Sequence, residues 1–345
     1  MRVLVTGSEG YVGALLPGAL MERGHEVVGV DTGFYKAGWL YNAPGRTAST
    51  LNQDIRRVQP QDLSGVQAVV HLAELSNDPI GALAPRITHE INHGGSLHLA
   101  RLAKAAGVRR FVYMSSCSVY GVATEESVSE DSALRPQTPY AVCKTLVERD
   151  LAAMGDGDFS PTFLRSATAY GASPRMRFDI VLNNLCGLAR TTGKITMESD
   201  GTPWRPFIHV RDMCKAVACT LEAPVDLVHN RAFNIGPEGG NRRIRDVAEI
   251  VAGVFQGCKV TFAPGGGPDT RTYRVSFARA AEELPGFSCD WDLERGAREL
   301  RDLFDQVDLS EETFRFRGFT RLKQIEYLLR TGQIDESFYW RPCAS

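Results

Sequence analysis

Residues 2–13 read Arg2-Val-Leu-Val-Thr-Gly7-Ser-Glu-Gly10-Tyr-Val-Gly13, an apolar run that leads directly into three evenly spaced glycines. The run predicts a buried strand, and the glycines predict a tight turn into a helix. In such a turn the first glycine allows the reversal, the second lets a phosphate approach the backbone, and the third lets the helix pack close to the strand. This stretch therefore predicts the first strand–helix unit of an α/β fold.

A carboxylate closes the next predicted strand, Glu26–Asp31. The N-terminus of the first helix offers free N–H groups and a positive dipole end to a pyrophosphate. A carboxylate placed as Asp31 is can hold both hydroxyls of a ribose, and it repels a 2′-phosphate. The sequence therefore predicts NAD rather than NADP, bound by Gly7, Gly10, Tyr11, Val12, Gly13 and Asp31.

The first half of the chain alternates apolar runs with amphipathic stretches. Unbroken apolar strands separated by helices indicate a parallel sheet covered on both faces. We expect a Rossmann-type doubly wound parallel sheet within residues 1–170, to which about 205–235 return. The predicted strands are Arg2–Thr6, Glu26–Asp31, Ala68–Leu72, Phe111–Ser115 and Thr162–Arg165, and the predicted helices include Tyr11–Arg23 and Ile91–Ala106.

The pattern changes after about residue 170, where short strands mix with helices. Residues 171–302 predict a smaller, mixed α/β C-terminal lobe that binds the substrate. Residues 303–345 form a C-terminal extension whose role the sequence leaves open. The predicted elements are helices at Arg175–Thr192, after His209–Asp212, and at Arg243–Phe255, Phe277–Glu283 and Thr320–Leu329, strands at Lys194–Met197 and Ala232–Ile235, and a polar turn at Ser199–Pro206.

The composition argues against several classes of protein. The 345 residues carry a formal net charge of −2 and no basic run, whereas a nucleic-acid partner requires a positive patch. No apolar run approaches the roughly 20 residues of a membrane-spanning helix, and the first strand leaves no room for a secretion signal. The eight cysteines form no Cys-x-x-Cys pair, which argues against a zinc site or a disulfide framework. We therefore expect a cytoplasmic protein without a metal, a nucleic-acid partner or a membrane partner.

The segment Thr138-Pro139-Tyr140-Ala-Val-Cys143-Lys144 carries a candidate proton-transfer group. Thr138 and Pro139 are typical of a helix start, so Tyr140 and Lys144 lie one turn apart on one helix face. The ammonium of Lys144 and the positive charge of oxidised nicotinamide are expected to lower the phenol pKa from about 10 toward the working pH. Tyr140 can then take a proton from a hydroxyl while hydride leaves the same carbon.

Two further segments, Ser115-Ser116-Cys117-Ser118-Val119-Tyr120-Gly121 and Ser199–Asp212, follow these motifs in order. Together the motifs resemble, over roughly residues 2–300, the extended short-chain dehydrogenase/reductase family, in particular its NAD-dependent nucleotide-sugar epimerase/dehydratase branch of UDP-galactose 4-epimerase-like enzymes. The resemblance implies that Ser116 is a catalytic hydroxyl beside Tyr140 and Lys144. His71-Leu72-Ala73-Glu74 resembles the family's His-x-Ala-Ala strand end. The cofactor contacts implied are Asp54, Ile55, Leu72, Ala73, Asn92, Tyr140 and Lys144.

The same resemblance implies a nucleotide-diphosphate sugar as substrate and a homodimer as the assembly. Arg205 is the expected diphosphate clamp, since a guanidinium fork fits phosphate oxygens in pairs, and Arg271 is a second candidate. Thr168 stands where the family usually has Asn, which puts that contact in doubt. The sequence leaves both the base and the sugar undefined. The implied substrate contacts are Ser76, Ser116, Cys117, Thr168, Asn184, Leu185, Thr196, Arg205 and Arg271.

The leading expectation is an NAD-dependent epimerase that inverts C4 through a transient keto sugar. Dehydratases of this branch that act at C4 and C6 carry Asp-Glu where this chain has Cys117-Ser118, which counts against that reaction. A net NAD(P)-dependent dehydrogenase or 4-ketoreductase uses the same Ser, Tyr and Lys and stays open. A 3,5-epimerase using Cys117 is the third alternative, and a non-catalytic, NAD-sensing scaffold is the fourth.

Overall fold

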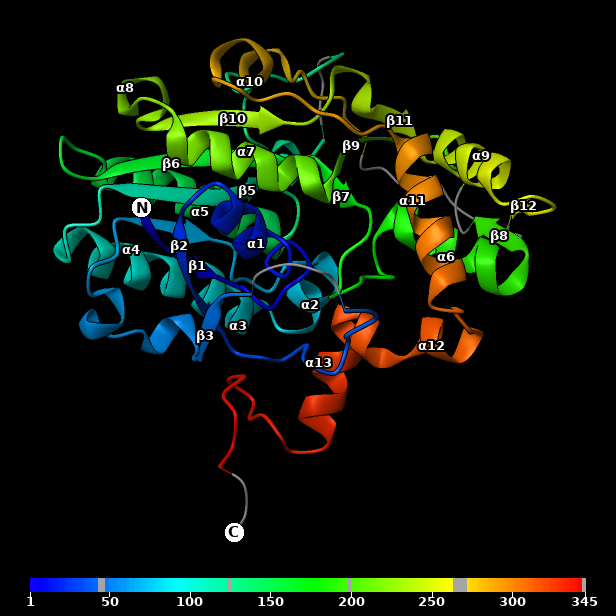
Figure 1. The fold of residues 1–345 in the computed structure, drawn as a ribbon, viewed down its shortest axis with the longest axis horizontal. Coiled ribbons are helices and arrows are strands. Elements are labelled where there is room, and N and C mark those ends of the chain that lie inside the picture. Colours follow the sequence, from blue (N-terminus) through cyan, green and yellow to red (C-terminus); the bar gives the residue numbers. More distant parts are fainter. Residues whose placement is uncertain (43–46, 123–125, 198–199, 263–271, 343–345) are drawn as a thin grey trace.

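The computed structural model describes residues 1–42, 47–122, 126–197, 200–262 and 272–342 (Figure 1). A seven-stranded sheet with the strand order β10-β6-β5-β4-β1-β2-β3 forms its centre, and every pair of neighbours is parallel. This arrangement confirms the expected doubly wound Rossmann-type fold. The strands are β1 (Arg2–Thr6), β2 (Glu26–Asp31), β3 (Ser49–Asn52), β4 (Ala68–His71), β5 (Arg110–Ser116), β6 (Ser160–Ser166) and β10 (Arg231–Ile235).

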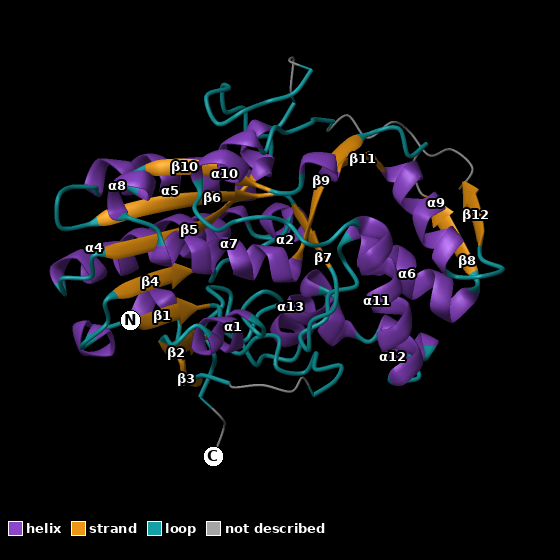
Figure 2. Cartoon of the chain, turned by 45° about the horizontal axis from the view of Figure 1, so that its top comes forward, coloured by secondary structure: helices purple, strands orange, loops and turns teal. Residues whose placement is uncertain are grey.

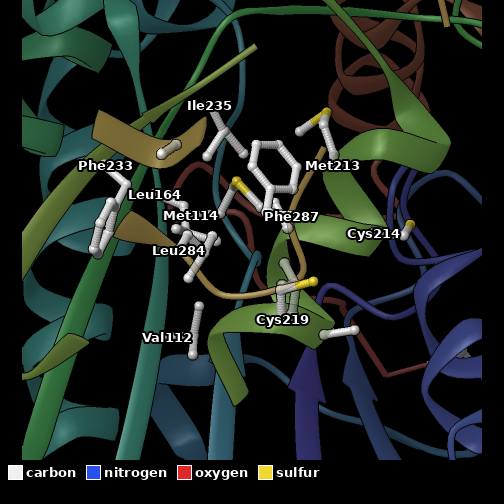
Figure 3. Packing of buried hydrophobic residues seen from close by; sticks show 14 of the residues in the cluster. Val112, Met114, Leu164, Met213, Cys214, Cys219, Phe233, Ile235, Leu284 and Phe287 are labelled. Carbon is white, nitrogen blue, oxygen red and sulfur yellow. The ribbon is translucent and has the colours of Figure 1, made fainter. Parts of the chain in front are cut away.

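Helices cover both faces of this sheet because the side chains of each strand alternate between them. Val3 and Val5 pack toward α1 (Leu16–Glu22) and α7 (Val210–Glu222), in the cluster that Figure 3 shows in part. Leu4 lies between them in sequence and packs on the opposite face, against α4 (Ser96–Ala105) and α5 (Pro139–Met154). The side chains of Val3, Leu4 and Val5 are all fully buried.

The second lobe holds two small sheets and three long helices (Figure 2). One sheet has the order β11-β9-β7, and the other pairs β12 with β8. The helices bury a separate apolar cluster against both sheets. The elements are β7 (Thr168–Tyr170), α6 (Val181–Thr192), β8 (Lys194–Met197), β9 (Trp204–His209), β11 (Asn241–Arg243), α9 (Ile244–Val254), β12 (Lys259–Phe262) and α11 (Leu293–Gln306).

Shorter elements complete the described chain. In the first half these are the 3-10 turns η1 (Ile55–Arg57), η2 (Pro60–Leu63) and η4 (Cys117–Tyr120), the helices α2 (Asp78–Leu83) and α3 (Pro85–His89), and the π-helical turn η3 (Glu90–Gly95). Later come α8 (Val225–Val228), η5 (Glu238–Gly240), α10 (Ala278–Glu283), α12 (Glu311–Arg315), η6 (Arg317–Phe319) and α13 (Arg321–Arg330). Within the described ranges, none of the helices combines the length and apolar character that crossing a bilayer requires.

Two predicted helices begin later than expected, and the predicted polar turn is shorter than expected. The helix expected over Tyr11–Arg23 becomes α1 only at Leu16, because Pro17 has no N–H with which to bond the carbonyl four residues earlier. The helix expected over Arg175–Thr192 begins at Val181, since Ile180 is extended. The polar turn expected at Ser199–Pro206 already contains the start of β9 at Trp204.

Arg165 on β6 is tied to Glu148 on α5 by a buried ion pair, with Nη2 and Oε2 2.7 Å apart. Ser115 donates a further hydrogen bond to the same carboxylate. This pair fixes α5, which carries Tyr140 and Lys144, against the sheet. Both side chains are only 7% exposed, so removal of one partner leaves a buried charge uncompensated.

We therefore predict that Arg165→Met lowers the free energy of unfolding by about 3 kcal/mol. Urea denaturation followed by circular dichroism measures this change. Arg149→Met is the matched control, because Arg149 lies beside Glu148 but is 66% exposed in its pair with Asp150. Equal stabilities for the two variants would contradict the structural role of the buried pair.

Candidate active site

A cavity of about 500 Å³ opens at the carboxyl ends of the central strands, where the strand order reverses between β1 and β4. Open α/β sheets bind their ligands at this place, and the volume lies within the usual range for small-molecule sites. Its walls come from the glycine turn, the ends of β2, β4 and β5, the start of α5, and residues 177–181.

The glycine turn forms one wall, and its positions 7 and 13 have no space for side chains. A Cβ atom on Gly13 would overlap the carbonyl oxygen of Gly7, and one on Gly7 would lie 2.9 Å from the Ala73 nitrogen. Gly7 also has a φ of +70°, which strains any other residue. The turn thus presents bare backbone to the cavity, as a pyrophosphate requires. The lining residues from this turn are Gly7, Gly10, Tyr11, Val12 and Gly13.

Asp31 lies on the cavity wall at the end of β2. Its carboxylate accepts N–H groups from Glu9 at 3.0 Å and Gly33 at 2.7 Å, which hold it in place. Burial raises the pKa of this carboxyl, although the two backbone hydrogen bonds oppose that effect. Each oxygen keeps a lone pair for a ribose hydroxyl. The bare turn and the fixed carboxylate together fit an adenosine dinucleotide.

The next part of the wall contains Asp54 and Ile55. The Asp54 carboxylate is already paired with Arg56, whose Nη2 lies 2.7 Å from Oδ2. Leu72 and Ala73 line the cavity after β4. Asn92 does not line it: this buried amide bonds both backbone groups of Leu75 from behind the wall. Asn92 therefore supports the strand end, and the direct cofactor contact expected for it is absent from the described geometry.

The structure brings Ser116, Tyr140 and Lys144 together on the cavity wall. Thr138 accepts the Ala141 N–H at 3.2 Å and caps α5, as the sequence predicts. Lys144 Nζ then lies 5.4 Å from the centre of the Tyr140 ring. The Ser116 hydroxyl, at the end of β5, lies near the Tyr140 phenol and acts to lower its pKa. A hydroxyl, a phenol and an amine therefore converge beside the predicted dinucleotide site.

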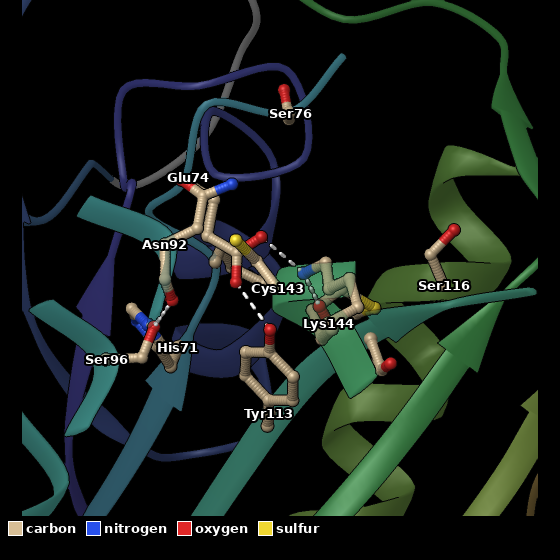
Figure 4. Close-up of polar contacts among 12 residues, drawn as sticks. His71, Glu74, Ser76, Asn92, Ser96, Tyr113, Ser116, Cys143 and Lys144 are labelled. Atoms are coloured by element: carbon tan, nitrogen blue, oxygen red, sulfur yellow. Dashed lines mark hydrogen bonds and ion pairs between the residues drawn. The ribbon is translucent and has the colours of Figure 1, made fainter. Parts of the chain in front are cut away.

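The structure adds Glu74, which the sequence analysis did not single out as a site residue (Figure 4). Its Oε2 lies 2.8 Å from Lys144 Nζ, and both side chains are at most 5% exposed. Tyr113 donates its hydroxyl to the other oxygen at 2.5 Å, while Lys144 also donates to the carbonyl of Met114. The available signal was the glutamate at the second alanine position of the resembled His-x-Ala-Ala motif.

The ion pair changes the expected electrostatics of Tyr140. Burial raises the pKa of this phenol above its usual value, Lys144 opposes the rise, and Glu74 adds to it. Lys144 thus lowers the phenol pKa as expected, but burial outweighs this effect and Glu74 adds to the rise, so the protein residues alone leave the pKa above its usual value. The lowering expected from oxidised nicotinamide stays a prediction. Burial also acts to lower the pKa of Lys144, but Glu74 and Tyr140 hold that pKa above its usual value.

Cys117 lies outside the cavity lining and is 1% exposed. Its thiol donates to the Arg165 carbonyl, 3.2 Å away. Burial raises the pKa of this thiol well above the usual range, so it stays protonated. The direct substrate contact expected for Cys117 is therefore not formed. The neighbouring Ser118 does line the cavity, and its buried hydroxyl oxygen has no hydrogen-bond partner among the described residues.

The expected substrate contacts divide into two groups. Ser76, Thr168 and Arg205 line the cavity, and Arg177 joins them with an Nη1 atom 3.4 Å from the Ser76 hydroxyl. Asn184, Leu185 and Thr196 do not line it. Asn184 bonds the Phe178 carbonyl, Leu185 packs in the core of the second lobe, and Thr196 is exposed on β8. Arg271 lies outside the described residues.

Among the described residues, no three His, Cys, Asp or Glu side chains are grouped closely enough to hold a metal ion. His71, for example, already uses both of its ring nitrogens, because it is buried between the hydroxyls of Thr6 and Ser96, 2.7 Å from each. Burial lowers the pKa of His71 to about 3, which keeps the ring neutral. It acts as a satisfied core group at the end of β4.

Comparison with known proteins identifies the family of this chain. Residues 3–236 match the model of the NAD dependent epimerase/dehydratase family. A UDP-glucose 4-epimerase of Bacillus subtilis (strain 168) is 26% identical over 336 residues, which cover 87% of this chain and 94% of that enzyme. These matches confirm the resemblance found in the sequence.

Two solved structures are similar over most of their length. TunA, an NAD-dependent NDP-hexosamine 5,6-dehydratase involved in tunicamycin biosynthesis, is 25% identical with a TM-score of 0.79, covering 89% of this chain and 99% of its own. MoeE5, solved in complex with UDP-glucose and NAD, is 28% identical with a TM-score of 0.76, covering 90% of this chain and 100% of its own. The family and these structures confirm NAD as the cofactor.

We predict that Glu74→Gln shifts the acidic limb of the kcat/KM pH profile to lower pH by about one unit. The phenol must lose its proton to act as a base, and Glu74 raises its pKa. Without that carboxylate, the Lys144 ammonium becomes the counter-ion of ionised Tyr140, so the phenol pKa falls. Initial rates across a pH series measure the shift.

Glu90→Gln is the matched control, because Glu90 is an exposed carboxylate paired with Arg86. Its profile should coincide with that of the unmodified protein. A limb that stays in place or moves to higher pH in Glu74→Gln would show that Glu74 acts mainly by keeping Lys144 protonated, contrary to the expectation.

Proposed function

Because the chain belongs to the NAD dependent epimerase/dehydratase family, we propose that it is a nucleotide-sugar epimerase that inverts C4 through a transient keto sugar. The observation that carries this proposal is the convergence of Ser116, Tyr140 and Lys144 on one cavity with the glycine turn. Proton transfer and hydride transfer at a single carbinol carbon need such an arrangement.

Bound NAD supplies the acceptor, and later the donor, of a hydride at the sugar carbon. Tyr140 accepts the hydroxyl proton as the carbon–oxygen double bond forms, and Ser116 donates a hydrogen bond to that oxygen. Lys144 holds positive charge beside the phenol. After the keto sugar turns over, Tyr140 returns its proton to the oxygen while the carbon regains hydride on its other face. The sequence of steps balances without an external oxidant or reductant.

A UDP-sugar is the first substrate class to test. The Bacillus subtilis relative is a UDP-glucose 4-epimerase, and MoeE5 was solved with UDP-glucose. Arg205 and Thr168 offer a cation and a hydroxyl on the cavity wall of the second lobe. We propose that they hold the diphosphate while the attached sugar reaches Tyr140, which lines the same cavity.

Dehydration is a second candidate, and two observations favour it. TunA, the 5,6-dehydratase, is similar over 89% of this chain, and Glu74 places a carboxylate on the cavity wall. The pairing of Glu74 with Lys144 counts against its use as a free acid or base. The location of Cys117 argues against a 3,5-epimerase, and the converged Ser, Tyr and Lys set argues against a scaffold without activity.

Incubation with a panel of nucleotide-sugars separates these reactions. An epimerised sugar of unchanged mass, formed without added cofactor, supports the proposal. Accumulation of NADH in proportion to product indicates a dehydrogenase, and a product lighter by one water indicates a dehydratase. Light scattering of the same preparation tests the homodimer that the resemblance implies.

We predict that Tyr140→Phe lowers kcat at least about 100-fold while NAD stays bound, because only the proton acceptor is removed. Turnover of the active nucleotide-sugar and the NAD content of the purified protein are the two measurements. Tyr327→Phe on α13 is the control, since Tyr327 does not line the cavity. Near-normal turnover in Tyr140→Phe would overturn the mechanism.

A further inference from the structure

Arg321 is the first residue of α13, in the C-terminal extension and beyond the residues that match the family model. Its side chain lines the cavity, although the residue is only 3% exposed. Nη1 has no hydrogen-bond partner among the described residues. A buried guanidinium that faces a cavity with an unused donor is costly unless an acceptor binds there.

Neighbouring groups hold Arg321 but leave its charge incompletely compensated. The guanidinium lies 3.9 Å from the centre of the Tyr35 ring, and the backbone N–H donates to Asp179. The Asp179 carboxylate is already paired with Arg177, with Nε and Oδ1 2.8 Å apart. Burial lowers the pKa of Arg321 to about 10, and repulsion from Arg177 adds to this effect, while Tyr35, Asp179 and Asp31 oppose it.

The segment that follows Arg321 is attached to the loop after β2. Gln324 donates to the Phe34 carbonyl at 3.0 Å, and the Trp340 indole donates to the Thr32 carbonyl at 2.6 Å. The rings of Phe34 and Trp340 have centres 5.6 Å apart. This loop begins immediately after Asp31, the predicted ribose-binding residue. Arg321 is therefore held on the adenosine side of the cavity.

A second attachment joins the same segment to the other loop of the predicted adenosine site. Arg56 pairs with Asp54 and donates to the Ser337 carbonyl at 2.9 Å. The Tyr339 ring lies 3.8 Å from the Arg56 guanidinium. The C-terminal segment thus connects the loop after Asp31 with the turn at Asp54, and the position of Arg321 is fixed by both.

We propose that Arg321 binds the pyrophosphate of the dinucleotide, so that the C-terminal helix completes the cofactor site. The glycine turn supplies backbone N–H groups but no cationic side chain, and the Lys144 ammonium is engaged by Glu74. Arg321 supplies a cation with a free donor, and a guanidinium suits phosphate oxygens well. The proposal rests on the dinucleotide site and not on the sugar chemistry proposed above.

The test compares ligands with and without phosphates by calorimetry. In Arg321→Met, the dissociation constants of NAD and ADP-ribose should rise at least about tenfold, while that of adenosine stays within about twofold. The protein should also retain less NAD through purification. Lys323→Met is the matched control, because Lys323 is exposed on the same helix and should leave all three ligands unaffected.

Equal weakening of adenosine and ADP-ribose in a folded protein, or no weakening of either, would overturn the assignment. Adenosine binding also reports whether the variant is folded. Should Arg321→Met lose it together with its circular dichroism signal, Arg321→Gln decides, because glutamine removes the charge but keeps a polar side chain: a loss confined to the phosphate-bearing ligands supports the proposal, and unchanged binding of ADP-ribose refutes it. These outcomes do not depend on turnover, so failure of the proposed epimerase reaction is distinguishable.

Discussion

The close approach of the glycine turn to the end of β4 is the constraint on which the site depends. Gly13 packs so tightly on Gly7, and Gly7 on Ala73, that neither glycine tolerates a side chain. This contact brings the N-terminal end of the first helical stretch to the reversal of strand order between β1 and β4. Because the backbone is bare there, a phosphate can reach N–H groups that no side chain shields. The proposed reacting groups on β5 and α5 depend on this turn, because it is where the pyrophosphate of the cofactor is predicted to bind.

Charge within the cavity is arranged so that the phenol is not acidic by default. Tyr140 is buried, and the ammonium that would stabilise its ionised form is shared with Glu74. Any additional positive charge that enters beside the Tyr140 ring therefore has a large effect on the phenol pKa, since burial weakens the screening of each charge. Ionisation of Tyr140 is thereby coupled to occupation of the cavity by a cationic ring.

Local sequence patterns predicted the parts of this structure that local contacts determine. β1 and β2 have the predicted bounds because an uninterrupted apolar run and its flanking glycines define them. The helix α11 was missed although Leu293, Ala297, Leu300 and Phe304 repeat at helical spacing, so that signal was available. Glu74 and Arg321 are different. The role of each depends on a partner or cavity formed by distant segments. The His71–Glu74 motif marks Glu74 only as a departure from the family pattern, and no motif or periodicity marks Arg321.

The same geometry explains why this part of the cavity receives a cation from the C-terminal segment. Gly7 and Gly13 of the turn have no room for a side chain, and the adjacent strand ends carry Ser76 and a Glu74 already engaged with Lys144. Arg321 supplies a cation from the C-terminal segment, outside the parallel sheet. That segment also bonds the loops after Asp31 and at Asp54. Because those bonds hold both loops, order in the C-terminal segment is coupled to order in the predicted dinucleotide site.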